Sequence, residues 1–127
     1  MRVLIIEDSA ITSRLIQTCL DSLATEVEVK HDGRKGLEAI DTFMPELVIL
    51  DLGLPSLDGW AVLTKIRNNQ RTANLPVVVV TGHGHEAVRT RAEMAGADGF
   101  VAKPFRPLEL QAATLRAVQK RKAMRGH

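Results

Sequence analysis

Short apolar runs alternate along this chain with longer stretches in which apolar residues recur at helical spacing. Continuous runs of three or four apolar residues lie at 3–6, 47–50, 77–80 and 100–102. An unbroken run of this kind is typical of a parallel strand that is covered on both faces. The alternation of such runs with helical patterns predicts repeated βα units around one parallel sheet.

A further short strand is predicted around Val27 and Val29, which alternate with charged residues. Right-handed crossovers leave few orders for five parallel strands, and 2-1-3-4-5 is a common one. The fold class predicted is therefore α/β: a flavodoxin-like (βα)5 doubly wound parallel sheet in the order 2-1-3-4-5, with helices on both faces.

Helical stripes predict which side chains are buried. In a helix expected at 9–23, the stripe recurs every four residues and is widened by two neighbours; its members are Ile11, Leu15, Cys19 and Leu23, with Ile16 and Leu20 beside them. For the two middle helices the expected faces are Leu37, Ile40 and Phe43, which precede Pro45, and Val62, Leu63 and Ile66. A last helix is expected to begin at Pro107, with the stripe Leu108, Leu115 and Val118.

The helix expected at 86–95 is only weakly apolar. Its best core candidates are Ala87, Val88, Ala92 and Ala95. Because such a face buries little area, this helix is expected to be a mobile element.

Composition places the chain among ordinary globular domains. It has 127 residues, of which 45% are hydrophobic and 25% charged, and this argues against disorder and against a membrane protein. No apolar run approaches the roughly 20 residues of a spanning helix, and the first run is too short for a signal peptide. The only cysteine, Cys19, has no partner for a disulfide and is expected to be a buried small hydrophobe. We expect a cytoplasmic protein with no membrane partner.

The net charge is only +2, and the excess of cations lies near the C-terminus. The residues concerned are Arg116, Lys120, Arg121, Lys122 and Arg125. Cations at the end of a helix complement its dipole and are solvated, so we expect no direct binding of nucleic acid by this domain. We interpret 1–121 as one domain and 122–127 as a basic tail, either the start of a linker or a remnant of cloning.

The four continuous runs end on residues suited to a phosphoryl group. Glu7 and Asp8 follow the first, Asp51 the second, Thr81 the third and Lys103 the fourth. The carboxyl ends of parallel strands form one edge of a sheet, where open α/β folds place their ligand sites. This convergence predicts a magnesium-dependent phosphoacceptor site.

Each residue type has a physical role in such a site. Two carboxylates about 4 Å apart repel by roughly 4 kcal/mol at an effective dielectric of 20, so three of them require a cation, and Mg²⁺ prefers oxygen ligands. Asp51 is the expected nucleophile because it ends a central strand alone. Lys103 would supply positive charge to the phosphoryl oxygens, Thr81 a hydroxyl, and Gly82 a backbone N–H.

Four sequence stretches carry a family resemblance. They are LIIEDS at 4–9, LVILDLGLPSLDGW at 47–60, VVVVTG at 77–82 and GADGFVAKPF at 96–105. With these motifs the chain resembles the receiver domain of a two-component response regulator over essentially its whole length. The resemblance implies a domain that accepts a phosphoryl group on Asp51 from a histidine kinase or a phosphotransfer protein.

The same resemblance implies further roles. Mg²⁺ would be held, directly or through water, by Glu7, Asp8, Asp51 and the main-chain carbonyl of Gly53. Lys103 would contact the phosphoryl group, and the Lys103–Pro104 peptide bond would be cis. The domain would catalyse only its own phosphorylation and dephosphorylation and would not be a turnover enzyme.

A switch is also implied by the resemblance. Phosphorylation would draw Thr81 inward, and Phe100 would rotate into the space that it leaves; a static, core-packed Phe100 is the alternative. The surface formed by the fourth helix, fifth strand and fifth helix would then regulate an effector protein or a linked output domain. Phe100 lacks the phenol hydroxyl often found in similar domains, which argues against a hydrogen-bonded version of the switch. Gly99 stands where a second acid is frequent at the symmetric dimer face of similar regulators, so homodimerisation stays open.

Gly53 and His83 occupy the positions that flank the phosphate in similar domains. Neither side chain resembles an acid or carboxamide that could steer water, and we expect His83 to face solvent.

Other functional classes fit less well. A haloacid-dehalogenase-like phosphatase needs a second Asp two residues after the nucleophile, where this chain has Gly53. A nucleotide or flavin binder needs a glycine-rich or hydroxyl-rich loop after the first strand, where this chain has Glu7, Asp8 and Ser9. A receiver-like domain that only docks partners would not need the intact set of acids.

Overall fold

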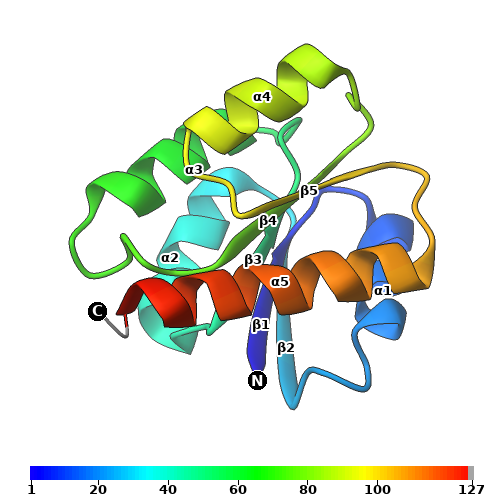
Figure 1. The fold of residues 1–127 in the computed structure, drawn as a ribbon, viewed down its shortest axis with the longest axis horizontal. Coiled ribbons are helices and arrows are strands. Elements are labelled where there is room, and N and C mark those ends of the chain that lie inside the picture. The colour runs from blue at the N-terminus through cyan, green and yellow to red at the C-terminus, as the bar shows by residue number, and fades with distance from the viewer. Residues whose placement is uncertain (126–127) are drawn as a thin grey trace.

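The computed structural model describes residues 1–125, which form five strands and five helices in strict alternation (Figure 1). In chain order these are β1 (Arg2–Ile6), α1 (Ala10–Cys19), β2 (Glu26–Lys30), α2 (Gly33–Phe43), β3 (Leu47–Leu50), α3 (Gly59–Asn68), β4 (Val77–Thr81), α4 (Glu86–Met94), β5 (Gly99–Ala102) and α5 (Pro107–Arg125).

All strand pairs are parallel, and the sheet order is β2-β1-β3-β4-β5, as predicted. In the central pair, Ile6 at the end of β1 lies opposite Leu50 at the end of β3. The residues that follow these two strands therefore emerge side by side.

Helices cover both faces of the sheet. In Figure 1, α5 runs across the near face, with α1 on the same side. Alternate strand residues serve the two faces: Val3 and Ile5 pack with α1 and α5, whereas Leu4 and Ile6 pack with α2 and α3. This division explains the unbroken apolar runs, because both sets of side chains are buried.

The predicted buried face of α1 is wrong in its first half. Ile11 is 84% exposed and Leu15 is 48% exposed. The helix instead buries Ser13, Ile16 and Cys19, and Leu20 directly after it is buried as well. A stripe with four-residue spacing drifts by about 40° at each step, so it begins on the solvent side and reaches the core only toward its end. The helix also ends at Cys19, earlier than predicted.

The predicted stripe of α5 is wrong for the same kind of reason. Leu108 is 77% exposed and Leu115 is 46% exposed, and only Val118 packs partly against the core. The buried hydrophobic residues of this helix are Leu110, Ala113 and Ala117. Small side chains let the helix approach β5, where Gly99 lacks a Cβ that would lie 3.5 Å from the carbonyl oxygen of Ala113. Side-chain size along the sequence was therefore a poor guide to burial.

The remaining helices follow the predictions more closely. Ile40 is buried in α2, and Val62, Leu63 and Ile66 are buried in α3. In α4 only Ala92 is buried, and among the other core candidates Val88 and Ala95 are partly covered, whereas Ala87 is exposed. Cys19 is buried, as predicted, and burial raises the pKa of its thiol.

The basic C-terminal segment is helical through Arg125, and Gly126 and His127 lie outside the described residues. Arg121 is not part of a solvated basic face. It is only 6% exposed, and its Nε donates a hydrogen bond of 2.7 Å to Asp98. Across the described part of the chain, no helix is both long and apolar enough to cross a membrane.

Candidate functional site

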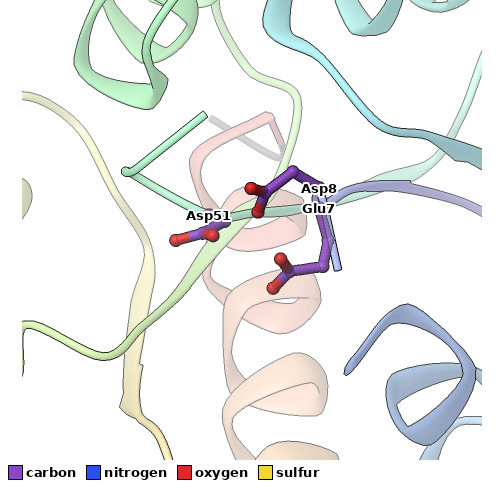
Figure 2. Close-up of side chains that lie close together, drawn as sticks. All are labelled: Glu7, Asp8 and Asp51. Atoms are coloured by element: carbon purple, nitrogen blue, oxygen red, sulfur yellow. The ribbon is translucent and has the colours of Figure 1, made fainter. Parts of the chain in front are cut away.

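The acidic residues come from the ends of two neighbouring strands. Glu7 directly follows β1, and Asp51 directly follows β3, where its backbone N–H donates to the carbonyl of Ile6 at 3.0 Å. Asp8 completes the set. One carboxylate oxygen from each of the three lies within 4.8 Å of the others, and Figure 2 shows the side chains close together.

Local backbone contacts orient these carboxylates. Ser9 caps α1 by accepting from the N–H of Thr12 at 3.2 Å, and its own N–H donates to Glu7 Oε2 at 3.1 Å. The N–H of Gly53 donates to Asp51 Oδ1 at 3.2 Å. Glu7 and Asp51 are therefore aimed by the turns that follow their strands.

The three acids differ in exposure. Glu7 is 1% exposed and Asp51 is 7% exposed, whereas Asp8 faces solvent. A buried carboxylate needs a partner of opposite charge, and Asp8 is the one that water can reach most easily.

Lys103 supplies part of the compensating charge. Its Nζ lies 2.6 Å from Glu7 Oε1 and 3.4 Å from Asp51 Oδ2, and its backbone N–H donates to the carbonyl of Thr81 at 2.8 Å. One ammonium against three carboxylates leaves the site negative. The geometry thus favours a further cation among the carboxylates.

Burial and pairing act together on the titration of this pair. Desolvation raises the pKa of Glu7, although the hydrogen bond from Lys103 opposes this. Burial alone would lower the pKa of Lys103, but its hydrogen bond to Glu7 and the charge of Asp51 outweigh that effect and raise it. Lys103 therefore remains an ammonium at neutral pH.

Thr81 and Gly82 lie at the neighbouring strand end. Thr81 is fully buried as the last residue of β4, and its hydroxyl accepts from the N–H of His83 at 3.2 Å. At Gly82, a Cβ would meet no other protein atom within 4 Å. The contact of its backbone N–H with a phosphoryl group stays a prediction. His83 is exposed, as predicted.

The other predicted residues are placed as follows. Gly53 lies in the exposed loop after β3. The Lys103–Pro104 peptide bond is cis, as the resemblance implies. Phe100 is 7% exposed and packs in the core cluster on the face of the sheet that α2, α3 and α4 cover.

Two sets of contacts were not predicted from the sequence, one beside the site and one at the opposite end of the sheet. The Nδ1 of His31, directly after β2, lies 2.9 Å from the carbonyl oxygen of Glu7. At the opposite end of the sheet, Asp98 is held by both Arg67 and Arg121, at 2.9 and 2.7 Å. The contact of His31 could have been predicted, because His31 directly follows a strand that was expected beside the first strand. The contacts of Asp98 could not, because Arg67, Asp98 and Arg121 lie far apart in the sequence.

Fold and site together define a class: a doubly wound α/β domain whose switch-point edge holds three carboxylates and one lysine. Residues 3–115 match the family described as "Response regulator receiver domain". The chain belongs to this family and is a receiver domain of a two-component response regulator.

Comparisons with individual proteins support the same family assignment. The chain is 37% identical over 120 residues to "Probable transcriptional regulator ycf27" of Guillardia theta, covering 94% of this chain and 46% of that protein. It is 35% identical to "DNA-binding dual master transcriptional regulator RpaA" of Synechocystis sp., covering 94% of this chain and 49% of that protein. Among solved structures, NtrX from Brucella abortus superposes with a TM-score of 0.88 at 31% identity, covering 98% of this chain and 28% of the other. The chain thus spans about half the length of the two curated relatives, ycf27 and RpaA, whose names describe transcriptional regulators.

Proposed function

We propose that this domain accepts a phosphoryl group on Asp51, in the presence of Mg²⁺, from a histidine kinase or a phosphotransfer protein. The observation that carries the proposal is the convergence of oxygens from Glu7, Asp8 and Asp51 within 4.8 Å of one another, with Lys103 beside them. Family membership supports the same assignment.

The carboxylates suit Mg²⁺ as a cofactor. Hard oxygen ligands, two of them largely buried, are the donors that this ion prefers, and Glu7, Asp8 and Asp51 would hold it together with the main-chain carbonyl of Gly53. When bound, the ion neutralises charge on the phosphoryl oxygens. Its affinity is expected to be modest until a phosphoryl oxygen supplies another ligand.

Asp51 is suited to act as the nucleophile. Its Oδ1 is held by Gly53, and its Oδ2 faces Lys103. A carboxylate oxygen of Asp51 forms a bond to phosphorus while the bond between phosphorus and the donor's imidazole nitrogen breaks, so the imidazole leaves. Attack of water on the acyl phosphate later returns the carboxylate and inorganic phosphate. We propose that the domain catalyses only these two reactions, its own phosphorylation and dephosphorylation.

Lys103 and Thr81 connect the site to the rest of the fold. The Lys103 ammonium moves from Glu7 to a phosphoryl oxygen, and the Thr81 hydroxyl leaves the N–H of His83 to donate to another. Phe100 then rotates toward the space that Thr81 vacates. The consequence is a changed surface on α4, β5 and α5.

We propose that this surface regulates an effector protein or a linked output domain. The support is that the curated relatives are transcriptional regulators about twice as long as the matched region. The receiver domain itself is proposed not to contact nucleic acid. Homodimerisation through the switched surface is left as an open alternative.

The test is the mass gain of one phosphoryl group on incubation with a small phosphodonor and Mg²⁺. We expect the gain in the wild-type protein and in Asp21→Asn, which removes an exposed carboxylate remote from the site, but not in Asp51→Asn. Equal modification of Asp51→Asn would show that Asp51 is not the acceptor.

A phosphatase with an aspartate nucleophile is the competing enzyme class. It requires an acid two residues after the nucleophile, and that position holds Gly53, which contributes only a backbone N–H to Asp51. The structure contains no observation that favours this alternative.

A further inference from the structure

Helix α4 has a narrow buried face and no side-chain cap at its N-terminus. Only Ala92 is buried, and His85 at its N-cap makes no side-chain capping hydrogen bond. The loop residues 82–85 before the helix and its first two residues, Glu86 and Ala87, are exposed. Neither a broad apolar face nor a cap therefore fixes the N-terminal half of α4.

Two arginines of α4 instead lie over aromatic rings from neighbouring elements. The guanidinium carbon of Arg89 lies 4.9 Å from the centroid of the Phe100 ring on β5. That of Arg91 lies 3.9 Å from the centroid of the Trp60 ring on α3. Neither arginine forms an ion pair with a carboxylate within residues 1–125.

The two arginines flank the small apolar face of the helix. Residues two apart on a helix point about 200° apart, so Arg89 and Arg91 leave α4 on different sides. Val88 and Ala92 lie between them on the face that meets the core. Figure 1 shows α4 in this position, above β5 and beside α3.

The C-terminal end of α4 is anchored by a different set of contacts. Arg67 of α3 donates to the carbonyl of Gly96 at 2.9 Å and to Asp98 at 2.9 Å. Arg121 of α5 donates to the other oxygen of Asp98, whose side chain is fully buried. Burial lowers the pKa of Arg67 to about 10, which leaves it charged at neutral pH. Because breaking a buried ion pair is costly, this end of α4 is fixed.

We propose that Arg89 and Arg91 form a two-sided cation–π latch that holds α4 in its resting position, with the helix free to pivot about its anchored C-terminal end. The latch rests on the proposed function for its role: because Phe100 is one of its two rings, rotation of Phe100 removes half of the latch. The two stacks thereby set how readily the resting domain converts to the switched form.

The first test measures hydrogen–deuterium exchange of the α4 amides in the resting protein, without any phosphoryl group. In Arg89→Gln and Arg91→Gln the side chain keeps its stem and helix propensity but loses its charge. Each substitution is expected to speed exchange of residues 86–94 by about 2- to 5-fold, and the double variant by about 5- to 25-fold.

Matched variants control for helix propensity and charge. Arg34→Gln removes an exposed arginine of α2 and should leave α4 exchange unchanged, whereas Arg89→Lys and Arg91→Lys keep a cation over each ring and should restore protection. If α4 in the double glutamine variant exchanges no faster than in Arg34→Gln, the latch does not exist.

The second test measures, by calorimetry, the affinity for beryllium trifluoride, a phosphoryl mimic, in the presence of Mg²⁺. A weaker latch raises the population that binds the mimic, so the double variant should bind it about 5- to 25-fold more tightly than wild type. Faster α4 exchange with unchanged mimic affinity would overturn the regulatory part of the proposal.

The proposed function and the latch can fail independently of each other. If wild type and Asp51→Asn respond alike to the mimic, the phosphoacceptor assignment fails, while the exchange measurement still decides whether the latch exists.

Discussion

At the scale of single residues, Lys103 is the cation that pairs with the buried carboxylates of the site. Its ammonium lies 2.6 Å from Glu7, whose carboxylate clusters with those of Asp51 and Asp8. Lys103 is therefore paired with Glu7 in this structure, and a divalent ion bound as proposed would compete with it for that carboxylate. In the proposed function the same side chain leaves Glu7 when a phosphoryl group binds.

Replacement of Lys103 by methionine should strengthen Mg²⁺ binding. Removal of the competing hydrogen bond to Glu7 is expected to raise the Mg²⁺ affinity by about 3- to 10-fold, and calorimetric titration measures it. Lys65→Met, which removes an exposed cation of α3, should not change the affinity. Weaker binding in Lys103→Met would mean that the lysine supports the ion rather than competing with it.

At the scale of the elements, the approach of α3 to β3 positions Asp51. Asp58 caps α3, and the N–H of Gly59 donates to the carbonyl of Leu52 at 2.9 Å. A Cβ on Gly59 would overlap the carbonyl oxygen of Asp51, which is backbone and cannot move aside without moving the site. Gly59 is thus needed for its lack of a side chain.

Substitution of Gly59 by alanine should destabilise the domain and disturb the site together. Overpacking at this contact is expected to cost about 1–3 kcal/mol, read from denaturant unfolding, and to slow phosphorylation by a small donor. The matched variant is Gly53→Ala in the loop that precedes α3, where a Cβ meets nothing within 4 Å and stability should be nearly unchanged. Equal stability of the two variants would contradict the packing argument.

The elements also show where sequence patterns predict burial well and where they do not. In α3 the stripe Val62, Leu63 and Ile66 was assigned correctly because large apolar residues and the buried face coincide. In α1 and α5 they do not coincide: Ile11 and Leu108 are exposed, while small residues such as Ala113 face the sheet. Burial there is set by how closely the helix approaches the strands.

At the scale of the whole molecule, the site and the anchor of α4 occupy opposite ends of the sheet. Glu7, Asp51 and Lys103 lie at the carboxyl ends of the strands, and Asp98 lies just before the start of β5. The central strands β3 and β4 between them are buried along their whole length. The proposed switch would therefore move the loops, α4 and the ring of Phe100, while these two central strands keep their packing.

Binding of Mg²⁺ should stabilise the whole domain, because the unfolded chain has no preformed site. At ten times the dissociation constant the free energy of unfolding should rise by about 1.4 kcal/mol, measured as an increase in Tm that a chelator reverses. The increase should be lost in Asp51→Asn and retained in Asp21→Asn. An equal increase in both variants would place the bound ion elsewhere.

Patterns along the sequence were enough to predict the strands, the sheet order and the carboxylates and lysine that meet at one edge of the sheet. Continuous apolar runs specify buried parallel strands, and the residues at the ends of these runs meet at the same edge of the sheet however the helices pack. Three further features became known from the folded structure: which faces of α1 and α5 are buried, that Lys103 pairs with Glu7, and that Arg67, Asp98 and Arg121 meet. The physical reason is that these contacts join residues distant in the chain, and their distances depend on how closely whole elements pack.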